Sequence, residues 1–564
     1  MKSHARLVVI GGGIIGCSVL YHLTRLGWRD VVLVERDELT SGATWHAAGQ
    51  AHQYSEAPFL ARVAKDSLDL YRRLERETGD SCGIHVPGGL RIARHDDGID
   101  EFKRYLPQAA YLGIEADIVG PNRVRELWPL LDTDDFLGAL HTPDEGYVDA
   151  TMTTNVIAKV ARENGATIYR HTLVTGLAQL PSGEWKTRTD KGDIISEYVV
   201  NCAGSWGGEI SALLGHYLPV MTMEHQYLVT EQCDALATLS AELPVLRDPS
   251  VPCYVRQERQ GLMVSAFEHE AKLRWLDGAP NDFSMSLFPS DLERSAGCLE
   301  TTFEMVPLLK TLGVRTVVNG PIPATPDLQG LLGPAHGLRN YFVCCGIHGG
   351  FVQGELSRHL AEWVVSGEPL TDLSLVDVRR FGKHVDRDFS VERLCAAHTM
   401  FALPASYPAM EPAGARPVRT DLLYTRLDER GAVFGEVNGY EVANWFAPPG
   451  VEAVDRPSFD RANWFAHVAS ECRCVRDGVG IANLPAAVIS VDGQGATALM
   501  ERISASPLPL PGTRRLSPFL SATGGIGLMV GIDHLVDGGF LLQAPVSVEL
   551  QLVDWVRNRV NDRD

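Results

Sequence analysis

The sequence has 564 residues, of which 45% are hydrophobic and 22% are charged. This length is enough for two or three domains with large cores, and the composition excludes an intrinsically disordered chain. The formal net charge of −20 would repel nucleic acids and anionic membrane surfaces, so we expect neither as a partner.

The first residues and the cysteines bear on the location of the protein in the cell. The chain enters a predicted strand within its first six residues, so we expect no signal sequence. Its cysteines follow neither the spacing of a zinc site nor that of a redox motif, and we expect no metal. Free thiols suit a reducing compartment, so a cytoplasmic location is expected.

The N-terminal segment predicts a strand–helix–strand unit. Residues 6–10 form a short apolar run of the kind found in buried parallel strands. Residues 14–26 repeat apolar side chains at helical spacing, and Gly27 closes this helix. Residues 31–34 predict a second buried strand. The three elements follow one another with short connections.

Later segments predict a mixture of helices and strands. Apolar spacing and turn residues predict, in chain order, helices at 58–77 and 151–163, strands at 167–174, 185–189 and 194–200, strand-like alternation over 219–264, and a strand at 341–345 followed by Gly346 and a helix that reaches residue 365.

The composition changes after residue 380. Residues 403–417 are rich in proline and show little periodicity, which indicates a connector. A separate arm rich in Trp and Phe begins at about Gly431. We therefore predict an N-terminal part at 1–380, a connector at 381–430 and a C-terminal arm at 431–564.

The strongest motif is the glycine-rich turn at residues 11–16. It follows a predicted strand, opens a helix and has an acidic residue, Glu35, at the end of the next strand, which is the pattern of a dinucleotide site. Gly11 permits the tight turn, Gly13 lets the backbone approach a pyrophosphate, and Gly16 lets the helix pack on the strand. The helix N-terminus, with Ile14 and Ile15, offers free N–H groups to the phosphates.

The sequence identifies the kind of nucleotide less clearly than it identifies the nucleotide site. Glu35 would accept hydrogen bonds from an adenosine ribose, and its carboxylate would repel a 2′-phosphate that the neighbouring Arg36 could otherwise bind. A second small-residue turn at Ala203 and Gly204 follows the strand at 194–200 and is a candidate contact of a flavin dinucleotide. A plain strand end explains the second turn equally well, and the first motif does not separate FAD from NAD.

One resemblance extends over nearly the whole chain. The segment at 41–49 resembles the flavin-attachment segment of the dimethylglycine and sarcosine dehydrogenases, a family of D-amino-acid-oxidase-like FAD-dependent oxidoreductases. The segments that carry the resemblance are 41–49 (SGATWHAAG), 144–149 (DEGYVD), 224–227 (EHQY), 319–321 (NGP), 360–363 (LAEW), 435–436 (GE) and 444–446 (NWF).

The resemblance implies a fold of mixed α/β and α+β class. An FAD-binding Rossmann-type domain would be interleaved with an antiparallel-sheet substrate domain, and a truncated aminomethyltransferase-like domain would follow. In that family the histidine of the attachment segment bonds to the isoalloxazine ring. The resemblance therefore gives this role to His46, with Thr44 as a further cofactor contact. Without the motif, a histidine that only packs would be the simpler interpretation.

The resemblance also implies the chemistry of the site. His225 is the candidate group that takes the proton of the substrate ammonium, and Tyr254 the one that orients the carboxylate or a water. Arg256 shares a strand face with Tyr254 by alternation, so it is a candidate carboxylate clamp. His348 stands where relatives usually carry a small polar residue. It is a candidate substrate contact that sets specificity, or a neutral filler.

The last cofactor contact is expected from the glycine-rich segment that surrounds His348. We expect a helix N-terminus there to face the pyrimidine end of the flavin and to stabilise negative charge on it. The glycines concerned are Gly346, Gly349 and Gly350.

The C-terminal arm resembles the start of a folate-binding aminomethyltransferase-like domain. Relatives carry acidic residues just after a Gly-Gly-Ile turn, whereas here Leu528 and Met529 follow residues 524–526. The chain ends at Asp564, before the rest of such an arm. We therefore expect no tetrahydrofolate binding and a structural role, such as a contact in a homo-oligomer.

These observations predict an FAD-dependent oxidoreductase that acts on the N-methyl group of a small N-methylated amino acid. Oxygen or an electron-transfer flavoprotein would accept the electrons. Three alternatives remain: an oxidoreductase of another secondary or cyclic amino acid, a non-redox binding or scaffold protein, and a folate-dependent methyl transferase.

Overall fold

The computed structural model describes residues 1–132, 134–268, 270–400, 403, 405–411, 413–483 and 485–560. The chain divides into two compact units. Unit 1 comprises Met1–Leu332, Asn340–Thr371 and Asp386–Gly414, and unit 2 comprises Gly333–Arg339, Asp372–Val385 and Ala415–Asp564. The domain bounds at 380 and 430 stay a prediction, and part of the predicted connector (401, 402, 404 and 412) lies outside the described residues.

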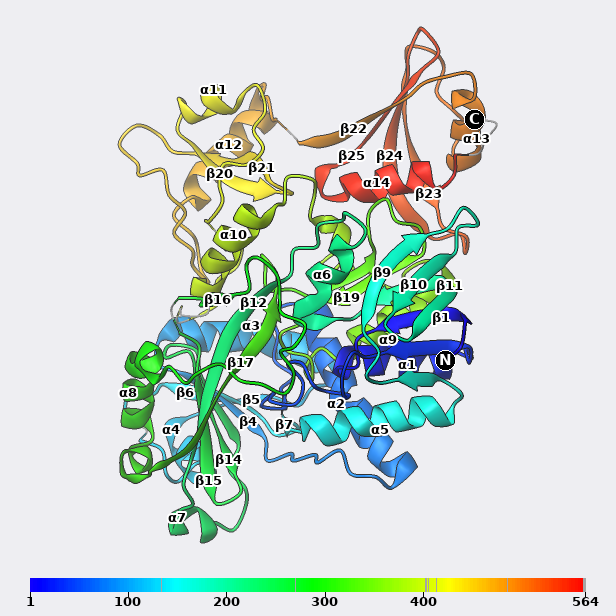
Figure 1. The fold of residues 1–564 in the computed structure, drawn as a ribbon. Coiled ribbons are helices and arrows are strands. Elements are labelled where there is room, and N and C mark those ends of the chain that lie inside the picture. The colour runs from blue at the N-terminus through cyan, green and yellow to red at the C-terminus, as the bar shows by residue number, and fades with distance from the viewer. Residues whose placement is uncertain are drawn as a thin grey trace. The chain divides into compact units, whose positions relative to one another are not determined.

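One of the two large sheets of unit 1 is largely parallel (Figure 1). Its strands, in spatial order, are β18 (Leu331–Pro334), β19 (Tyr341–Cys345), β11 (Gly192–Asn201), β1 (His4–Ile10), β2 (Val31–Val34) and β8 (Thr167–Tyr169), and the antiparallel strands β10 (Trp185–Thr189) and β9 (Val174–Gln179) extend it from β11. The central strands β1 and β2 are almost wholly buried because helices α1 (Ile14–Arg25), α5 (Ala150–Glu163) and α9 (Leu356–Ser366) pack in this region. The predicted strand–helix–strand unit is therefore present.

The segment predicted as one strand at 167–174 is two strands. β8 continues the parallel sheet, and β9 begins at Val174 as part of an antiparallel hairpin. His171 lies between them with a φ of 51°, in the left-handed region, so the chain turns away from the sheet. The apolar pattern of the segment does not indicate this turn.

The second sheet of unit 1 is mainly antiparallel. Its strands, in spatial order, are β16 (Leu273–Arg274), β12 (Met221–Thr230), β15 (Gly261–Ala266), β14 (Cys253–Glu258), β13 (Val245–Asp248), β4 (Gly89–Ala93), β6 (Gly138–Thr142) and β5 (Asp117–Val119), with β17 (Val314–Ala324) also paired with β12. The interleaving expected for the substrate domain is present, since β4 to β6 precede β8 in the chain and β12 to β17 follow β11.

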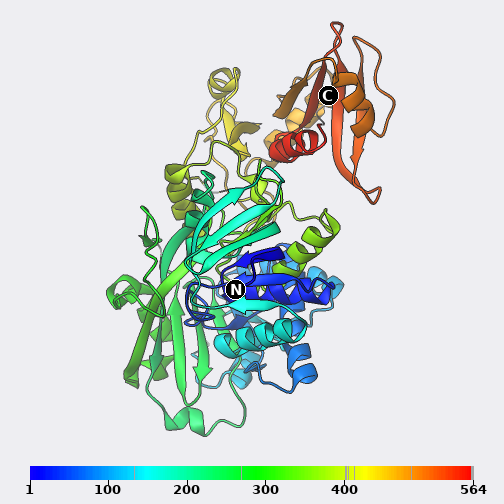
Figure 2. The same ribbon diagram turned by 45° about the vertical axis from the view of Figure 1, so that its right-hand side comes forward.

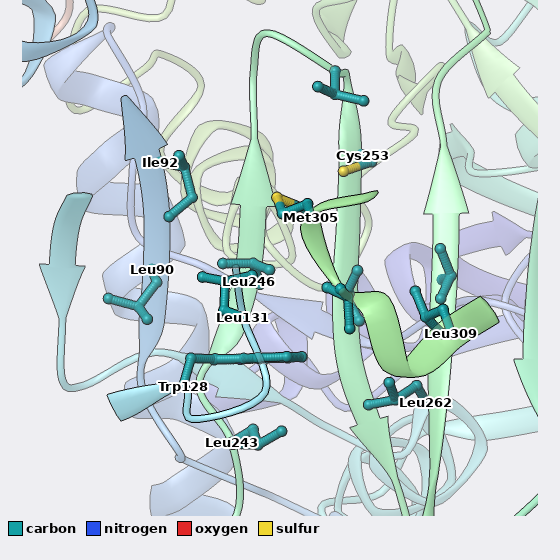
Figure 3. Close-up of a cluster of buried hydrophobic side chains, with 14 of the residues drawn as sticks. Leu90, Ile92, Trp128, Leu131, Leu243, Leu246, Cys253, Leu262, Met305 and Leu309 are labelled. Atoms are coloured by element: carbon teal, nitrogen blue, oxygen red, sulfur yellow. The ribbon is translucent and has the colours of Figure 1, made fainter. Parts of the chain in front are cut away.

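One face of this second sheet carries a large hydrophobic cluster. Figure 3 shows Leu90, Leu246 and Cys253 on their strands, together with Trp128 and Met305 from neighbouring segments. Because side chains alternate along a strand, the residues between these positions point to the other face. The other face is therefore available for polar groups.

Further elements complete unit 1. They are the pair β3 (Gln50–Ala51) and β7 (Gly146–Tyr147), and the helices α2 (Pro58–Thr78), α3 (Asp96–Leu112), α4 (Pro121–Leu127), α6 (Gly207–Ala212), α7 (Asp234–Ala237), α8 (Ala296–Met305) and α10 (Arg387–Thr399).

Unit 2 has a core of its own, which includes the buried Phe519, Phe540 and Leu552. Figure 2 shows its C-terminal strands, in orange and red, as a sheet of their own. Its elements are the hairpin β20 (Ala432–Val437) and β21 (Tyr440–Phe446), the sheet of β22 (Ala486–Val491), β25 (Phe540–Pro545), β24 (Ile526–His534) and β23 (Arg514–Leu520), and the helices α11 (Tyr424–Asp428), α12 (Phe465–Asp477), α13 (Ala496–Ile503) and α14 (Glu549–Arg557).

Within the described parts of the chain, every helix is too short or too polar to cross a bilayer.

Candidate functional site

A cavity of about 580 Å³ lies in unit 1. The glycine-rich turn at 11–15, the segment from Ser41 to Glu56, and residues 344–353 contribute to its wall. Side chains of the second sheet, among them His225 and Tyr254, complete it. The cavity therefore joins the nucleotide-binding motif to the candidate catalytic residues.

The glycine-rich turn is built as the motif predicts. Gly11 has a φ of 109°, and a Cβ there would lie 2.5 Å from the carbonyl oxygen of Cys202. A Cβ on Gly16 would overlap the carbonyl oxygen of Gly11, so this glycine serves the packing of α1 on β1 and does not line the cavity. Gly13 precedes α1 in an extended conformation and lines the cavity.

The carboxylate of Glu35 is held by the same turn. It accepts hydrogen bonds from the backbone N–H groups of Gly12 at 2.7 Å and Asp37 at 2.9 Å, and burial raises its pKa. Each carboxylate oxygen has a second lone pair, which a ribose hydroxyl could use. The guanidinium of Arg36 lies 3.8 Å from the ring centre of Trp206 and donates to the carbonyl of Phe283. It therefore belongs to the wall of the cavity near Glu35.

The N-terminus of α1 faces the cavity. The hydroxyl of Thr44 accepts a hydrogen bond from the N–H of Ile14 at 3.2 Å, and Ile15 follows in the cavity wall. Ala203 and Gly204 also line the cavity, and Gly204 has a φ of 55° at the turn after β11. The N–H groups of a helix N-terminus that remain free, beside such turns, suit a pyrophosphate.

His46 is the group best suited to bind a flavin ring. Its side chain is buried and lines the cavity, and its Nε2 atom has no hydrogen-bond partner among the described residues. Burial lowers its pKa to about 4, so the imidazole is neutral at pH 7 and keeps a free lone pair. The ring lies against the backbone of Gly320, where a Cβ would be 2.6 Å from Nε2. A neutral, unpartnered nitrogen in this position fits an attachment to FAD.

The glycine-rich segment around His348 is not a helix N-terminus. Gly346, Gly349 and Gly350 line the cavity as predicted, but residues 348–352 form turns and α9 begins only at Leu356. Gly346 has a φ of 67°, and a Cβ on it would overlap the side chain of Thr325, so the backbone must leave the strand sharply. The stabilisation by a helix dipole that we expected for this segment therefore has no structural basis.

His225 and Tyr254 meet through a third side chain, Ser265. The hydroxyl of Ser265 donates its proton to the carbonyl of Gln226 at 2.8 Å and lies 3.1 Å from Nε2 of His225. Since the hydroxyl has one proton, it accepts from Nε2–H, and the lone pair of His225 is on Nδ1. Tyr254 lies directly opposite Ser265 on the neighbouring strand. Burial lowers the pKa of His225 to about 4 and raises that of Tyr254.

The two predicted substrate contacts have different positions. His348 lines the cavity, and burial lowers its pKa to about 4. Arg256 does not belong to the described residues that line it. Its guanidinium pairs with Glu258 at 2.7 Å and lies 4.1 Å from the ring centre of Tyr147. The structure thus brings His348 to the site, and it does not bring Arg256 there.

Sequence reasoning missed two arginines of the cavity, Arg91 and Arg247. Arg91 lies between the apolar Leu90 and Ile92 in strand β4, and Arg247 follows the apolar Leu246 in strand β13. A charged residue next to a core residue in a short strand was the available signal, because alternation places it on the face opposite the core.

Comparison with known proteins agrees with this geometry. Residues 6–363 match the family described as FAD dependent oxidoreductase, and residues 423–564 match the family described as GCVT N-terminal domain. The first match covers more than half of the chain, so the protein belongs to the FAD dependent oxidoreductases. The predicted family and fold class are confirmed.

Individual relatives are more specific. The chain is 36% identical to mitochondrial dimethylglycine dehydrogenase of Rattus norvegicus over 563 residues, which are 98% of this chain and 66% of that protein. It is 32% identical to 4-methylaminobutanoate oxidase (formaldehyde-forming) of Paenarthrobacter nicotinovorans over 570 residues, 99% of this chain and 68% of that one. The chain thus spans about two thirds of the length of these relatives.

A solved structure resembles the larger part of the chain. L-proline dehydrogenase from P. horikoshii has a TM-score of 0.59 and 25% identity, over 67% of this chain and 98% of that one.

Proposed function

We propose that the protein is an FAD-dependent amine oxidoreductase that oxidises the N-methyl carbon of a small N-methylated amino acid. The observation that carries the proposal is the neutral, unpartnered His46 in the same cavity as His225 and Tyr254. The printed names of the two relatives above, a dimethylglycine dehydrogenase and a formaldehyde-forming methylaminobutanoate oxidase, support the same substrate class.

FAD, when bound, supplies the oxidation that removes a hydride from the N-methyl carbon and leaves an iminium, which water converts to formaldehyde and the demethylated amine. The groups of this chain hold and prepare the reactants. Glu35 would bind the ribose, the N-terminus of α1 would bind the pyrophosphate, and His46 would hold the ring system, covalently.

His225 prepares the amine in this proposal. An ammonium group has no lone pair to assist loss of a hydride, so the substrate must first lose a proton. The lone pair on Nδ1 of His225 can accept this proton, since Nε2–H is occupied by Ser265. Tyr254, which lies opposite Ser265 on the neighbouring strand, would orient the substrate beside His225.

The covalent attachment is tested by acid precipitation of the purified protein. We expect the yellow colour to stay in the pellet of the unchanged protein and to move to the supernatant in the variant His46→Ala. The variant His348→Ala, a second cavity histidine, is the matched control and should keep its colour in the pellet. Colour in the supernatant of the unchanged protein would refute the covalent bond.

The reaction is tested by anaerobic bleaching of the flavin with a panel of amines. Dimethylglycine, sarcosine and 4-methylaminobutanoate should bleach it and yield formaldehyde. Bleaching by L-proline alone, without formaldehyde, would instead support oxidation of a cyclic amino acid, which the structural likeness to L-proline dehydrogenase makes the second candidate. A colourless protein would favour a non-redox binding role. Reoxidation by oxygen or by an electron-transfer flavoprotein then identifies the acceptor.

We propose further that unit 2 does not bind tetrahydrofolate and acts as a structural part of the protein. Leu528, on β24, is directed into the core of unit 2, and Met529 is an exposed thioether. Neither side chain can pair with a ring nitrogen of folate. Isothermal titration with tetrahydrofolate should show no tight binding, and a tight complex would favour the folate-dependent methyl transferase.

A further inference from the structure

A row of polar side chains crosses the second sheet of unit 1 on the face opposite its hydrophobic core. Strand register pairs Arg91 with Arg247, Arg247 with Tyr254, Tyr254 with Ser265, and Ser265 with Tyr227. Residues directly opposite each other on neighbouring strands point to the same face of a sheet. These five side chains therefore share one face.

The row has a catalytic end and a cationic end. His225 lies two residues from Tyr227 on β12, so it faces the same way. Arg91 and Arg247 occupy the other end, on the neighbouring strands β4 and β13, and both line the cavity. Tyr254 stands between them, opposite Arg247 on one neighbouring strand and opposite Ser265 on the other.

The protein pairs the two guanidinium groups to different degrees. Nε of Arg91 is buried without a hydrogen-bond partner among the described residues, and Nη2 of the same group lies 3.6 Å from the carboxylate of Glu101. Nε and Nη2 of Arg247 donate to the side-chain oxygen of Gln50, and its Nη1 donates to the carboxylate of Glu145 at 3.3 Å. Like charges on adjacent strands repel each other, and this cost is highest away from bulk water.

The rest of the cavity around the arginines adds no further positive charge. Burial lowers the pKa of His225 and of His348 to about 4, and that of His52 well below its usual value, so these imidazoles are neutral at pH 7. An anion placed beside Arg91 and Arg247 would gain charge-assisted hydrogen bonds and would relieve their repulsion.

From this placement we infer that Arg91 and Arg247 bind the carboxylate of the substrate, while the amine lies toward His225. The inference deepens the proposed function and rests on it for the identity of the substrate. It replaces Arg256 as the candidate clamp, because Arg256 is paired with Glu258 and lies outside the cavity lining.

The test measures binding without turnover. Methoxyacetate is a carboxylate of the size of N-methylated glycine that has no amine to oxidise, and methoxyacetamide is its uncharged counterpart. Calorimetric titration of the flavin-loaded protein with each probe gives two dissociation constants. We expect the unchanged protein to bind the carboxylate more tightly than the amide.

The variants Arg91→Met and Arg247→Met should each weaken methoxyacetate binding about ten- to hundredfold, as for loss of a charge-assisted hydrogen bond, and leave methoxyacetamide unchanged. Arg256→Met is the matched control from the same sheet and should change neither constant. If Arg247→Met does not fold, Arg247→Lys keeps the charge and should show a smaller loss, confined to the carboxylate.

Three results would overturn the inference. The first is that the unchanged protein does not prefer the carboxylate to the amide. The second is that the Arg91 and Arg247 variants bind the carboxylate as tightly as the unchanged protein. The third is that only Arg256→Met loses carboxylate binding. The two proposals can fail separately. If methoxyacetate binding depends on the two arginines but no N-methylated amine bleaches the flavin, the proposed function is refuted and the anion site is retained.

Discussion

His225 is neutral at pH 7 because burial holds its pKa near 4. It can therefore act as a base without first losing a proton of its own. Its hydrogen bond with Ser265 fixes which nitrogen carries the lone pair. The burial of His225 thus sets its protonation state, and its hydrogen bond with Ser265 sets the position of its lone pair.

This protonation state predicts the pH dependence of the reaction. The ratio kcat/KM should show no inflection near pH 6.5, the ordinary value of a histidine, because His225 stays neutral down to about pH 4. His225→Gln should lower kcat/KM by about 10² to 10⁴ without changing the shape of the profile between pH 5.5 and 8.5. An inflection near pH 6.5 that disappears in the variant would contradict the buried, neutral state.

Gly320 is the residue on which the position of His46 depends. A Cβ on Gly320 would lie 2.6 Å from Nδ1 and Nε2 of that imidazole, well inside van der Waals contact. Gly320→Ala should therefore displace the ring and reduce the fraction of flavin retained after acid precipitation.

A matched control for this change exists on α8. A Cβ on Gly297 would meet no atom of the described residues within 4 Å, so Gly297→Ala should retain all the flavin. Equal retention in both alanine variants would show that the contact at Gly320 does not position His46.

At the scale of elements, a buried hydrogen bond connects α1 to the residue that precedes α9. Nε2 of His22 lies 2.7 Å from Glu355, and Arg358 pairs with the other oxygen of the same carboxylate at 2.8 Å. Glu355 directly precedes α9, and its N–H donates to Ser67 on α2. Glu355 thus connects the nucleotide-binding helix to α9 through its carboxylate and to α2 through its backbone N–H.

Removal of this carboxylate should destabilise unit 1. Glu355→Ala leaves His22 and Arg358 without their partner, and we expect a loss of about 3–5 kcal/mol in the free energy of unfolding. Urea unfolding followed by circular dichroism measures it. Glu362→Ala, at a more exposed position on the same helix, should cost about 1 kcal/mol or less. Equal costs would mean that the buried pair contributes no more than a surface pair.

At the scale of the whole molecule, several buried histidines make stability depend on pH. Burial lowers the pKa of His225, His348 and His359 to about 4 each, with Arg358 adding to the effect on His359. The unfolded chain binds protons below about pH 6.5 that the folded chain does not. Stability is therefore complete above pH 6.5 and is lost as the pH falls toward 4.

His359 isolates this effect outside the cavity. Its pKa shift corresponds to about 2 kcal/mol of stability lost between pH 6.5 and 5. His359→Gln should reduce the difference between the free energies of unfolding at these two values by about this amount. An unchanged difference would show that the histidine is protonated in the folded state.

The sequence by itself determined the nucleotide-binding turn and its acidic partner. These features are local, because the turn at 11–16 and Glu35 lie within one strand–helix–strand unit. Each glycine is required by a close contact with a residue nearby in the chain or next to the adjoining strand. The candidates His46, His225, Tyr254 and His348 were found through comparison with the family, and the structure brings them to the same cavity.

Only the tertiary structure decided which arginines face that cavity. Arg91, Arg247 and Tyr254 come from three strands, one of them far away in the chain, and strand register alone makes them neighbours. Arg256 shares its strand with Tyr254, as alternation predicts, yet Glu258 and Tyr147 hold it elsewhere. Alternation along a strand gives the face of a side chain, whereas its neighbours depend on pairing between distant segments, which the sequence of one strand does not contain.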